Sequence, residues 1–209
     1  MSSGSTNYWR AQEVLEQLAR TGEAKGLRNW ADSLVDTKRD DFLCSCFVAG
    51  LELNNWPFAL ECISLGCQFS SMSPPLDGPI HAALTLMGDC SDAIRVLCEH
   101  GLDVNQRGLG RSTPLMRAVR LEREKSAIVL LEHGADINST DEIDFDTPLI
   151  EAAKLCNATL AEILVKAGAD VSLTNILGDT AADVAAVNNC KDIVLVIHAA
   201  GKRGTQTGD

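Results

Sequence analysis

The sequence predicts an all-α fold, a solenoid of stacked helix pairs, and two periodic signals support this prediction. The first signal is a Thr-Pro-Leu motif that begins at Thr113 and again at Thr147. The second is a glycine just after an apolar stretch, which recurs at steps of 35, 33, 34 and 33 residues: Gly66, Gly101, Gly134, Gly168 and Gly201. A period of this length is typical of stacked repeats and argues against a single-core enzyme fold.

Each repeat has a predicted start and a predicted stop. A threonine hydroxyl can cap the free N–H groups of a helix, and a proline at the first helical position has no N–H to leave unsatisfied. Glycine ends a helix because it adopts the left-handed conformation without steric cost. Between Thr147 and Gly168 the apolar pattern predicts helices over 148–155 and 159–167. The Gly-Ala-Asp segments that follow Gly134 and Gly168 are predicted to open a β-hairpin finger.

This pattern resembles the ankyrin repeat, which shares the Thr-Pro-Leu-His-x-Ala-Ala start and the Gly-Ala-Asp-Val-Asn stop. The resemblance covers about residues 77–201 and includes the variant start Gly78-Pro79-Ile80-His81-Ala82-Ala83. Residues 45–70 match as a degenerate first repeat, which starts at Ser45 and has Phe47 at the leucine position. The resemblance implies an ankyrin-repeat solenoid of about five repeats over residues 38–201, with β-hairpin fingers.

The two ends of the chain differ from the repeats. Residues 8–20 and 27–35 read as amphipathic helices, so residues 1–37 are predicted to form an N-terminal helical cap. A solenoid needs such a cap because its first repeat otherwise exposes an apolar face. Residues 202–209 read as a polar C-terminal tail.

Composition limits the classes of partner and the compartment. Eighteen basic and 29 acidic residues give a net charge of -11, which disfavours nucleic acid and favours a basic protein partner. The sequence has no stretch of about 20 apolar residues and no secretory signal at its start, so neither a membrane nor export is expected. The eight cysteines are therefore predicted to be reduced thiols in a cytoplasmic protein, which is expected to be a monomer when free.

By resemblance, the function is non-enzymatic protein binding through the concave face and the finger tips, without a cofactor. Two more specific hypotheses follow. The chain is either an acidic antagonist, such as an immunity protein that occludes a toxin or another basic protein, or an adaptor subunit of a complex. A metal- or thiol-dependent enzyme is kept as a minor alternative, although the sequence contains no Walker A, H-E-x-x-H or G-x-S-x-G motif.

A row of leucines provides the first candidate surface. Leu53, Leu86, Leu121 and Leu155 each lie eight residues after a repeat start, at spacings of 33, 35 and 34. In an ankyrin stack this position ends the inner helix and faces the concave groove, where an apolar row would mark a binding surface. The alternative is that these leucines pack between neighbouring repeats as ordinary core.

The finger tips provide the second candidate surface. Residues 141–146 alternate acidic and apolar side chains, and the preceding repeat is rich in arginine. Apolar side chains supply contact area and carboxylates select a cationic partner, but neighbouring fingers could instead neutralise each other. The predicted partner-binding residues on the two surfaces are Leu86, Arg107, Leu109, Arg111, Arg117, Arg120, Leu121, Asp141, Glu142, Ile143, Asp144, Phe145, Asp146, Leu155, Ile176 and Leu177.

Clustered cysteines and repeated histidines could indicate a metal site or a catalytic site. Cys44, Cys46, Cys62 and Cys67 lie within 24 residues, but a C-x-C pair inside a helix is not the usual zinc spacing, so small buried residues are the preferred interpretation. His100 and His133 immediately precede stop glycines, where the helix dipole favours a cation. No metal ligand and no catalytic residue is predicted.

Overall fold

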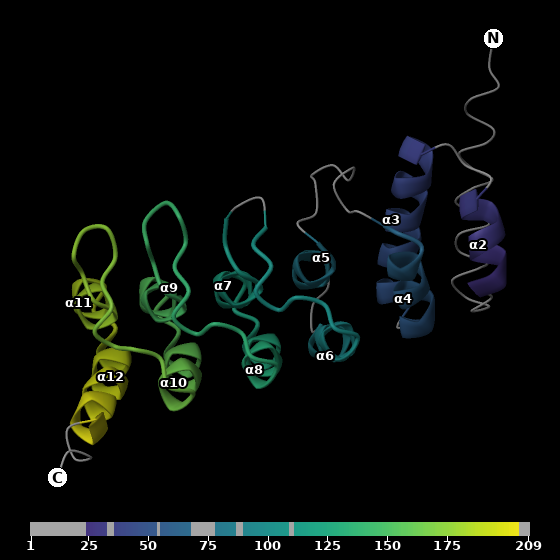
Figure 1. Ribbon diagram of the computed structural model, residues 1–209. Coiled ribbons are helices and arrows are strands. Elements are labelled where there is room, and N and C mark those ends of the chain that lie inside the picture. Colours follow the sequence, from purple (N-terminus) through teal and green to yellow (C-terminus); the bar gives the residue numbers. More distant parts are fainter. Residues whose placement is uncertain are drawn as a thin grey trace. The chain divides into compact units, whose positions relative to one another are not determined.

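The computed structural model describes residues 24–32, 36–53, 55–67, 78–86, 90–108 and 111–204, and its regular elements there are helices (Figure 1). The chain divides into two compact units, unit 1 (residues 1–100) and unit 2 (residues 101–209). The predicted helix over 8–20 lies outside the described residues. None of the helices in the described ranges is long and apolar enough to cross a bilayer.

In the described part of unit 1, a short helix packs on a helix pair. Helix α2 (Ala24–Asp32) contacts both α3 (Asp36–Glu52) and α4 (Trp56–Ser64), and it buries Leu27 and Ala31. An ion pair of 3.1 Å between Arg28 and Glu61 joins α2 to α4. The helix predicted over 27–35 is therefore present, but it begins at Ala24, and residues 33–35 lie outside the described residues. The second pair of unit 1 is α5 (Pro79–Leu86) and α6 (Ser91–Glu99).

The start predicted for the first repeat at Ser45 is wrong. Helix α3 is continuous over 17 residues, and Ser45 lies in its middle with its Oγ donating to the carbonyl oxygen of Asp41 at 2.8 Å. No Thr-Pro stands here to stop the helix from extending toward the N-terminus, so α3 is longer than the inner helices of later repeats. Phe47 nevertheless takes the predicted core position and is fully buried.

Unit 2 contains three helix pairs that stack side by side (Figure 1). The predicted starts are confirmed: the hydroxyl oxygens of Thr113, Thr147 and Thr180 each accept a hydrogen bond from the N–H three residues later. The inner helices are α7 (Pro114–Arg120), α9 (Pro148–Lys154) and α11 (Ala181–Val187), and the outer helices are α8 (Glu124–Glu132), α10 (Ala158–Lys166) and α12 (Lys191–Gly204).

Four of the five predicted helix stops are confirmed. Gly66, Gly101, Gly134 and Gly168 have φ between 81° and 95°, the left-handed conformation that terminates a helix. The stop predicted at Gly201 is wrong, because α12 continues through it to Gly204.

Recurrent side-chain hydrogen bonds join successive repeats of unit 2. The N–H of Asp136 donates to Asn105 Oδ1 at 2.8 Å, and the N–H of Asp170 donates to Asn138 Oδ1 at 2.9 Å. Each asparagine lies just after a stop glycine and reaches the equivalent segment of the next repeat. The fingers that these segments open are hairpin loops, and their only β feature among the described residues is an isolated bridge between Thr174 and Thr180.

Candidate functional site

Two finger loops of unit 2 are closed in the same way. The loop over residues 141–146 precedes α9, and the loop over residues 175–179 precedes α11. In the first loop Asp141 Oδ1 accepts hydrogen bonds from the N–H groups of Asp144 and Asp146. In the second loop Asn175 Oδ1 accepts from the N–H groups of Leu177 and Asp179, each at 3.0 Å. These side-chain bonds add to one backbone bond across each loop, from the N–H of Asp141 to the carbonyl oxygen of Asp146 at 3.1 Å and from the N–H of Asn175 to that of Asp179 at 3.0 Å.

A backbone hydrogen bond holds the two loops side by side. The N–H of Ile176 donates to the carbonyl oxygen of Asp144 at 2.8 Å. Figure 1 shows the two loops extending in the same direction from the ends of α9 and α11. The side chains at their tips therefore form one surface.

Large apolar side chains are exposed on this surface. The exposed fractions are 69% for Ile143, 49% for Phe145, 60% for Ile176 and 79% for Leu177. We call these four residues the fingertip patch. Single exposed apolar residues are common on proteins, whereas groups of large ones are typical of interaction surfaces.

Phe145 adopts a backbone conformation that is unfavourable for its residue type. Its φ is 55°, whereas the equivalent position of the next finger is Gly178 with a φ of 84°. A left-handed conformation costs a residue with a side chain about 1–2 kcal/mol relative to the right-handed one. Arg111, at the equivalent position of the preceding finger, also has a φ of 55°, so the conformation belongs to the finger turn of each repeat, and Phe145 places a half-exposed aromatic ring where glycine would be more stable.

The carboxylates of the first finger do not all face solvent, and this corrects the prediction that they would. Asp141 and Asp146 are buried and form ion pairs within unit 2, Asp141 with Arg120 at 2.6 Å and Asp146 with Lys154. They are buried because the finger closes onto the inner helices, which carry the cations. Asp144 differs from the other carboxylates of this finger. It is exposed, and the described residues show no ion pair for it.

The two buried carboxylates have pKa values shifted in opposite directions. Burial alone would raise the pKa of Asp141, but hydrogen bonds from Arg120 and from the N–H groups of Asp144 and Asp146 outweigh burial and lower it. Burial raises the pKa of Asp146, and its ion pair with Lys154 only partly offsets this. One oxygen of Asp146, Oδ1, is buried without a hydrogen-bond partner among the described residues. Asp141 is therefore the carboxylate that stabilises the folded finger.

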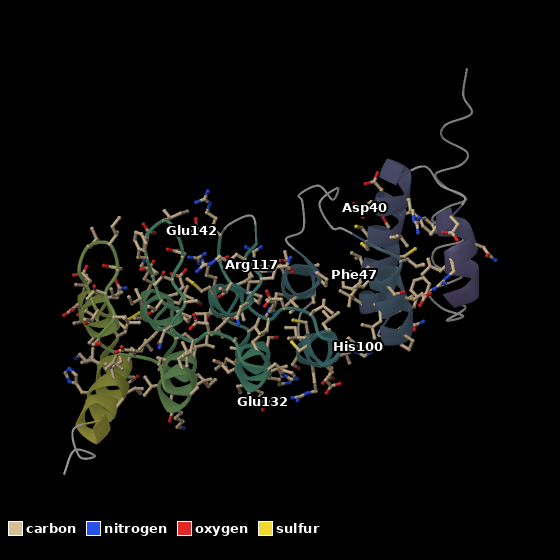
Figure 2. The ribbon with its side chains drawn as sticks, viewed as in Figure 1. Asp40, Phe47, His100, Arg117, Glu132 and Glu142 are labelled. Atoms are coloured by element: carbon tan, nitrogen blue, oxygen red, sulfur yellow. A yellow bond between two sulfur atoms is a disulfide. The ribbon has the colours of Figure 1, made fainter. Side chains whose placement is uncertain are left out.

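Arginines of the preceding repeat bind the finger loop over residues 141–146. Such contacts agree with the alternative interpretation, in which neighbouring fingers neutralise each other. Arg111 pairs with Glu142, and Arg107 donates to the carbonyl oxygen of Thr140 at 2.8 Å. Arg120 on α7 also pairs with Glu151 on α9 at 2.6 Å. Figure 2 shows Glu142 on the loop before α9 and Arg117 on α7. These cations hold the loop in place.

Two more of the predicted partner-binding residues belong to the same repeat. Arg117 on α7 is half-buried, and Leu109 lies outside the described residues. A contact of either residue with a partner stays a prediction.

The described side chains of the leucine row are partly exposed, so they are not ordinary core. The exposed fractions are 47% for Leu53 and 40% for Leu155, and Leu121 is half-buried. Leu121 and Leu155 are the C-cap residues of α7 and α9, so both lie at the same end of the inner helices of unit 2. Leu86 ends α5, and its side chain lies outside the described residues. Partner contact at this row stays a prediction.

The histidines next to the stop glycines make local contacts. The Nδ1 atoms of His100 and His133 lie 2.8 Å from the carbonyl oxygens of Val96 and Val129, one helical turn earlier. These contacts bind the end of each outer helix, so the geometry assigns both residues a capping role.

Two cysteines of unit 2 are joined, which corrects the prediction that all eight are thiols. Cys156 and Cys190 form a disulfide with a Cα–Cα distance of 5.5 Å. They occupy neighbouring positions in the turns between inner and outer helix of successive repeats. One repeat earlier the same positions are Glu122 and Asn157, and Asn157 Nδ2 donates to Glu122 Oε2 at 3.0 Å. Spacing alone did not reveal this pair because 34 residues separate the two cysteines.

Two family models match this chain of helix pairs. A model of three ankyrin repeats matches residues 58–141, and a model of a single ankyrin repeat matches residues 144–176. The chain belongs to the ankyrin repeat family. Together the two matches cover more than half of this ankyrin repeat protein, and ankyrin repeats are protein–protein interaction modules. A comparison with curated proteins found no match.

Proposed function

We propose that this ankyrin repeat protein binds a basic protein through the fingertip patch and acts as an antagonist, in the manner of an immunity protein that occludes a toxin. Phe145 carries the proposal, since it exposes an aromatic ring from a strained position. Aromatic residues are enriched among the few side chains that supply most of the binding energy at interfaces. The proposal assigns no chemical step to the protein.

The rigidity of the finger loops supports tight binding. Asp141, Asn175 and the bond between Ile176 and Asp144 fix both loops before a partner arrives. A preformed surface loses little conformational entropy on association, so more of the contact energy appears as affinity.

The charge of the protein supports a basic partner. The net charge is -11, and Asp144 lies in the chain between Ile143 and Phe145 of the patch. A carboxylate beside exposed apolar side chains suits an amphipathic surface that carries lysine or arginine. An antagonist of this kind needs only to bind stably over the active surface of its partner. A cytoplasmic site of action remains a prediction.

The first prediction is that Phe145→Gly weakens binding while it stabilises the fold. We expect affinity for the partner to fall about 30-fold, equivalent to about 2 kcal/mol, because a central aromatic contact is lost. We expect the free energy of unfolding to rise by about 0.5–1 kcal/mol because glycine adopts a positive φ without strain. Immobilised wild-type protein would first capture partners from a lysate, and the purified partner would then be titrated with each variant.

Two variants make this experiment specific. Asn189→Gly changes another left-handed residue, with a φ of 60°, in the turn between α11 and α12, and it should bind as the wild type does. Leu121→Glu with Leu155→Glu tests the leucine row. If that double variant loses one partner and Phe145→Gly loses another, the protein is an adaptor with two surfaces. Equal binding by the wild type and Phe145→Gly would refute the fingertip proposal.

The second prediction concerns Asp144→Lys. We expect the association rate constant with the purified partner to fall about threefold to tenfold at low ionic strength, with little change at high salt, because exposed charges act mainly through steering. Stopped-flow binding at several salt concentrations measures this. Asp192→Lys makes the same charge change on α12 and should have a smaller effect. A rate at low salt that is unchanged by Asp144→Lys would exclude a basic partner surface at the fingers.

A further inference from the structure

Three potential metal ligands of unit 1 lie close together at the first helix pair. The Sγ atoms of Cys44 and Cys67 are 2.9 Å apart, and Asp40 Oδ1 is 3.8 Å from Cys44 Sγ. The three donor atoms all lie within 4.8 Å of one another. Cys44 and Cys67 are buried, and Asp40 is half-buried, so the cluster has one side open to solvent.

The fold fixes the positions of these three side chains. Asp40 and Cys44 are four residues apart on α3 and therefore share a face of the helix. Cys67 follows Gly66, whose φ of 90° turns the chain back after α4. The N–H of Cys67 donates to the carbonyl oxygen of Cys62 at 3.2 Å, which holds the turn. The site is thus built from a helix and an ordered turn.

Cys46 and Cys62, the other two cysteines between residues 44 and 67, are also buried. Cys62 donates its thiol proton to the carbonyl oxygen of Phe58 at 3.2 Å. A hydrogen bond with Cys46, together with burial, raises the pKa of the Cys62 thiol. The donor atoms that all lie within 4.8 Å of one another come from Asp40, Cys44 and Cys67, and neither Cys46 nor Cys62 belongs to this group.

The chemistry of the three donors selects a soft divalent cation. Thiolates bind Zn²⁺ far better than Mg²⁺ or Ca²⁺, which prefer oxygen ligands in larger number. In a tetrahedral zinc site with Zn–S bonds of about 2.3 Å, the two sulfur atoms lie about 3.8 Å apart. The sulfur atoms of Cys44 and Cys67 would separate by about 1 Å to reach this geometry.

We propose that Cys44, Cys67 and Asp40 bind one Zn²⁺ ion, with a water molecule as fourth ligand. On binding, each thiol gives up its proton and forms a Zn–S bond, so one Zn²⁺ releases two protons. The ion joins α3 to the turn after α4 and thereby stabilises the first helix pair. This inference is independent of the fingertip patch, which lies in unit 2.

The third prediction is one zinc ion per chain. The full-length protein is reduced, freed of metal with a chelator and titrated with Zn²⁺ against a chromophoric chelator. We expect a stoichiometry of one, and we expect it to fall to zero in Cys44→Ser with Cys67→Ser. Titration with Co²⁺ instead should give the absorption bands of thiolate-bound cobalt. The release of two protons per ion should make the affinity rise with pH.

A pair of carboxylate variants keeps the proposal testable if the cysteine variant misfolds. Asp40→Asn should lower the zinc affinity at least about tenfold, since even residues that only support a ligand have effects of that size. Asp41→Asn removes the neighbouring exposed carboxylate of α3 and should leave the affinity unchanged. Equal affinities for these two variants would overturn the proposal. So would a stoichiometry of zero for the wild type, or a Cys44–Cys67 disulfide as the stable form of the protein in the presence of zinc and a thiol reductant.

Discussion

Asp141→Ala is expected to lower the free energy of unfolding by about 3 kcal/mol, because the change removes a buried charge that holds three partners. Asp141 Oδ2 accepts from Arg120 Nη2 at 2.6 Å, and Oδ1 accepts from the N–H groups of Asp144 and Asp146 at 3.0 and 3.3 Å. Without the carboxylate these N–H groups lose their acceptor. Arg120 keeps Glu151, which limits the loss.

Urea denaturation of the full chain, followed by circular dichroism, measures this effect. Asp144→Ala removes an exposed carboxylate from the same loop and should change stability by less than about 0.5 kcal/mol. Asp141→Asn keeps one side-chain acceptor and should fall between the two. If Asp141→Ala is as stable as Asp144→Ala, the buried ion pair does not stabilise the finger.

The same residue gives a pH dependence with a definite sign. The pKa of Asp141 is lower in the folded protein than its ordinary value of 3.8. Its contribution is therefore fully present above that value and is lost as the pH falls through the folded pKa. The pKa of Asp146 is raised, so the contribution of that residue has the opposite sign. The wild type should lose more stability than Asp141→Asn when the pH falls from 5 to about 2.

Reduction of the Cys156–Cys190 disulfide is expected to cost about 3–4 kcal/mol, because the bond closes a loop with a sequence separation of 34 residues and so restricts the unfolded chain. The loss should be concentrated in the last helix pair. Cys190 immediately precedes α12, and α12 packs on both α10 and α11.

Hydrogen exchange of the α12 amides, with and without a thiol reductant, measures this effect. In the wild type the reductant should speed up exchange in α12 more than in α8. In the double variant Cys156→Ser with Cys190→Ser, the reductant should have no effect, and this serves as the control. Mass spectrometry that finds eight alkylatable thiols in protein purified without reductant would contradict the disulfide itself.

The start and stop signals of the repeats could be predicted because they act locally. A threonine oxygen caps an N–H three residues away, as Thr113, Thr147 and Thr180 do, and a glycine takes a positive φ by itself. Where the local signal was weak, the prediction was wrong. Nothing in the sequence stops α3 at Ser45, and Gly201 ends no helix since a glycine can also be accommodated within one.

The finger over residues 141–146 shows which features of the candidate site a sequence pattern can predict. Alternating acidic and apolar residues correctly indicated exposed Ile143 and Phe145. The same pattern gave no sign that Asp141 and Asp146 would be buried, because their cations come from Arg120, 21 residues away, and Lys154, 8 residues away. The strain at Phe145 could have been anticipated, since the aligned position of the next finger is Gly178.

The sequence by itself determined the repeat, its helix pairs and the residues at each finger, because these depend on contacts within one turn of helix or one loop. Only the tertiary structure decided which charges are paired inside unit 2 and which cysteines meet. Pairs such as Cys44 with Cys67 and Cys156 with Cys190 are separated by 23 and 34 residues. Stacking brings such residues together, and no local rule can state which neighbour each will contact.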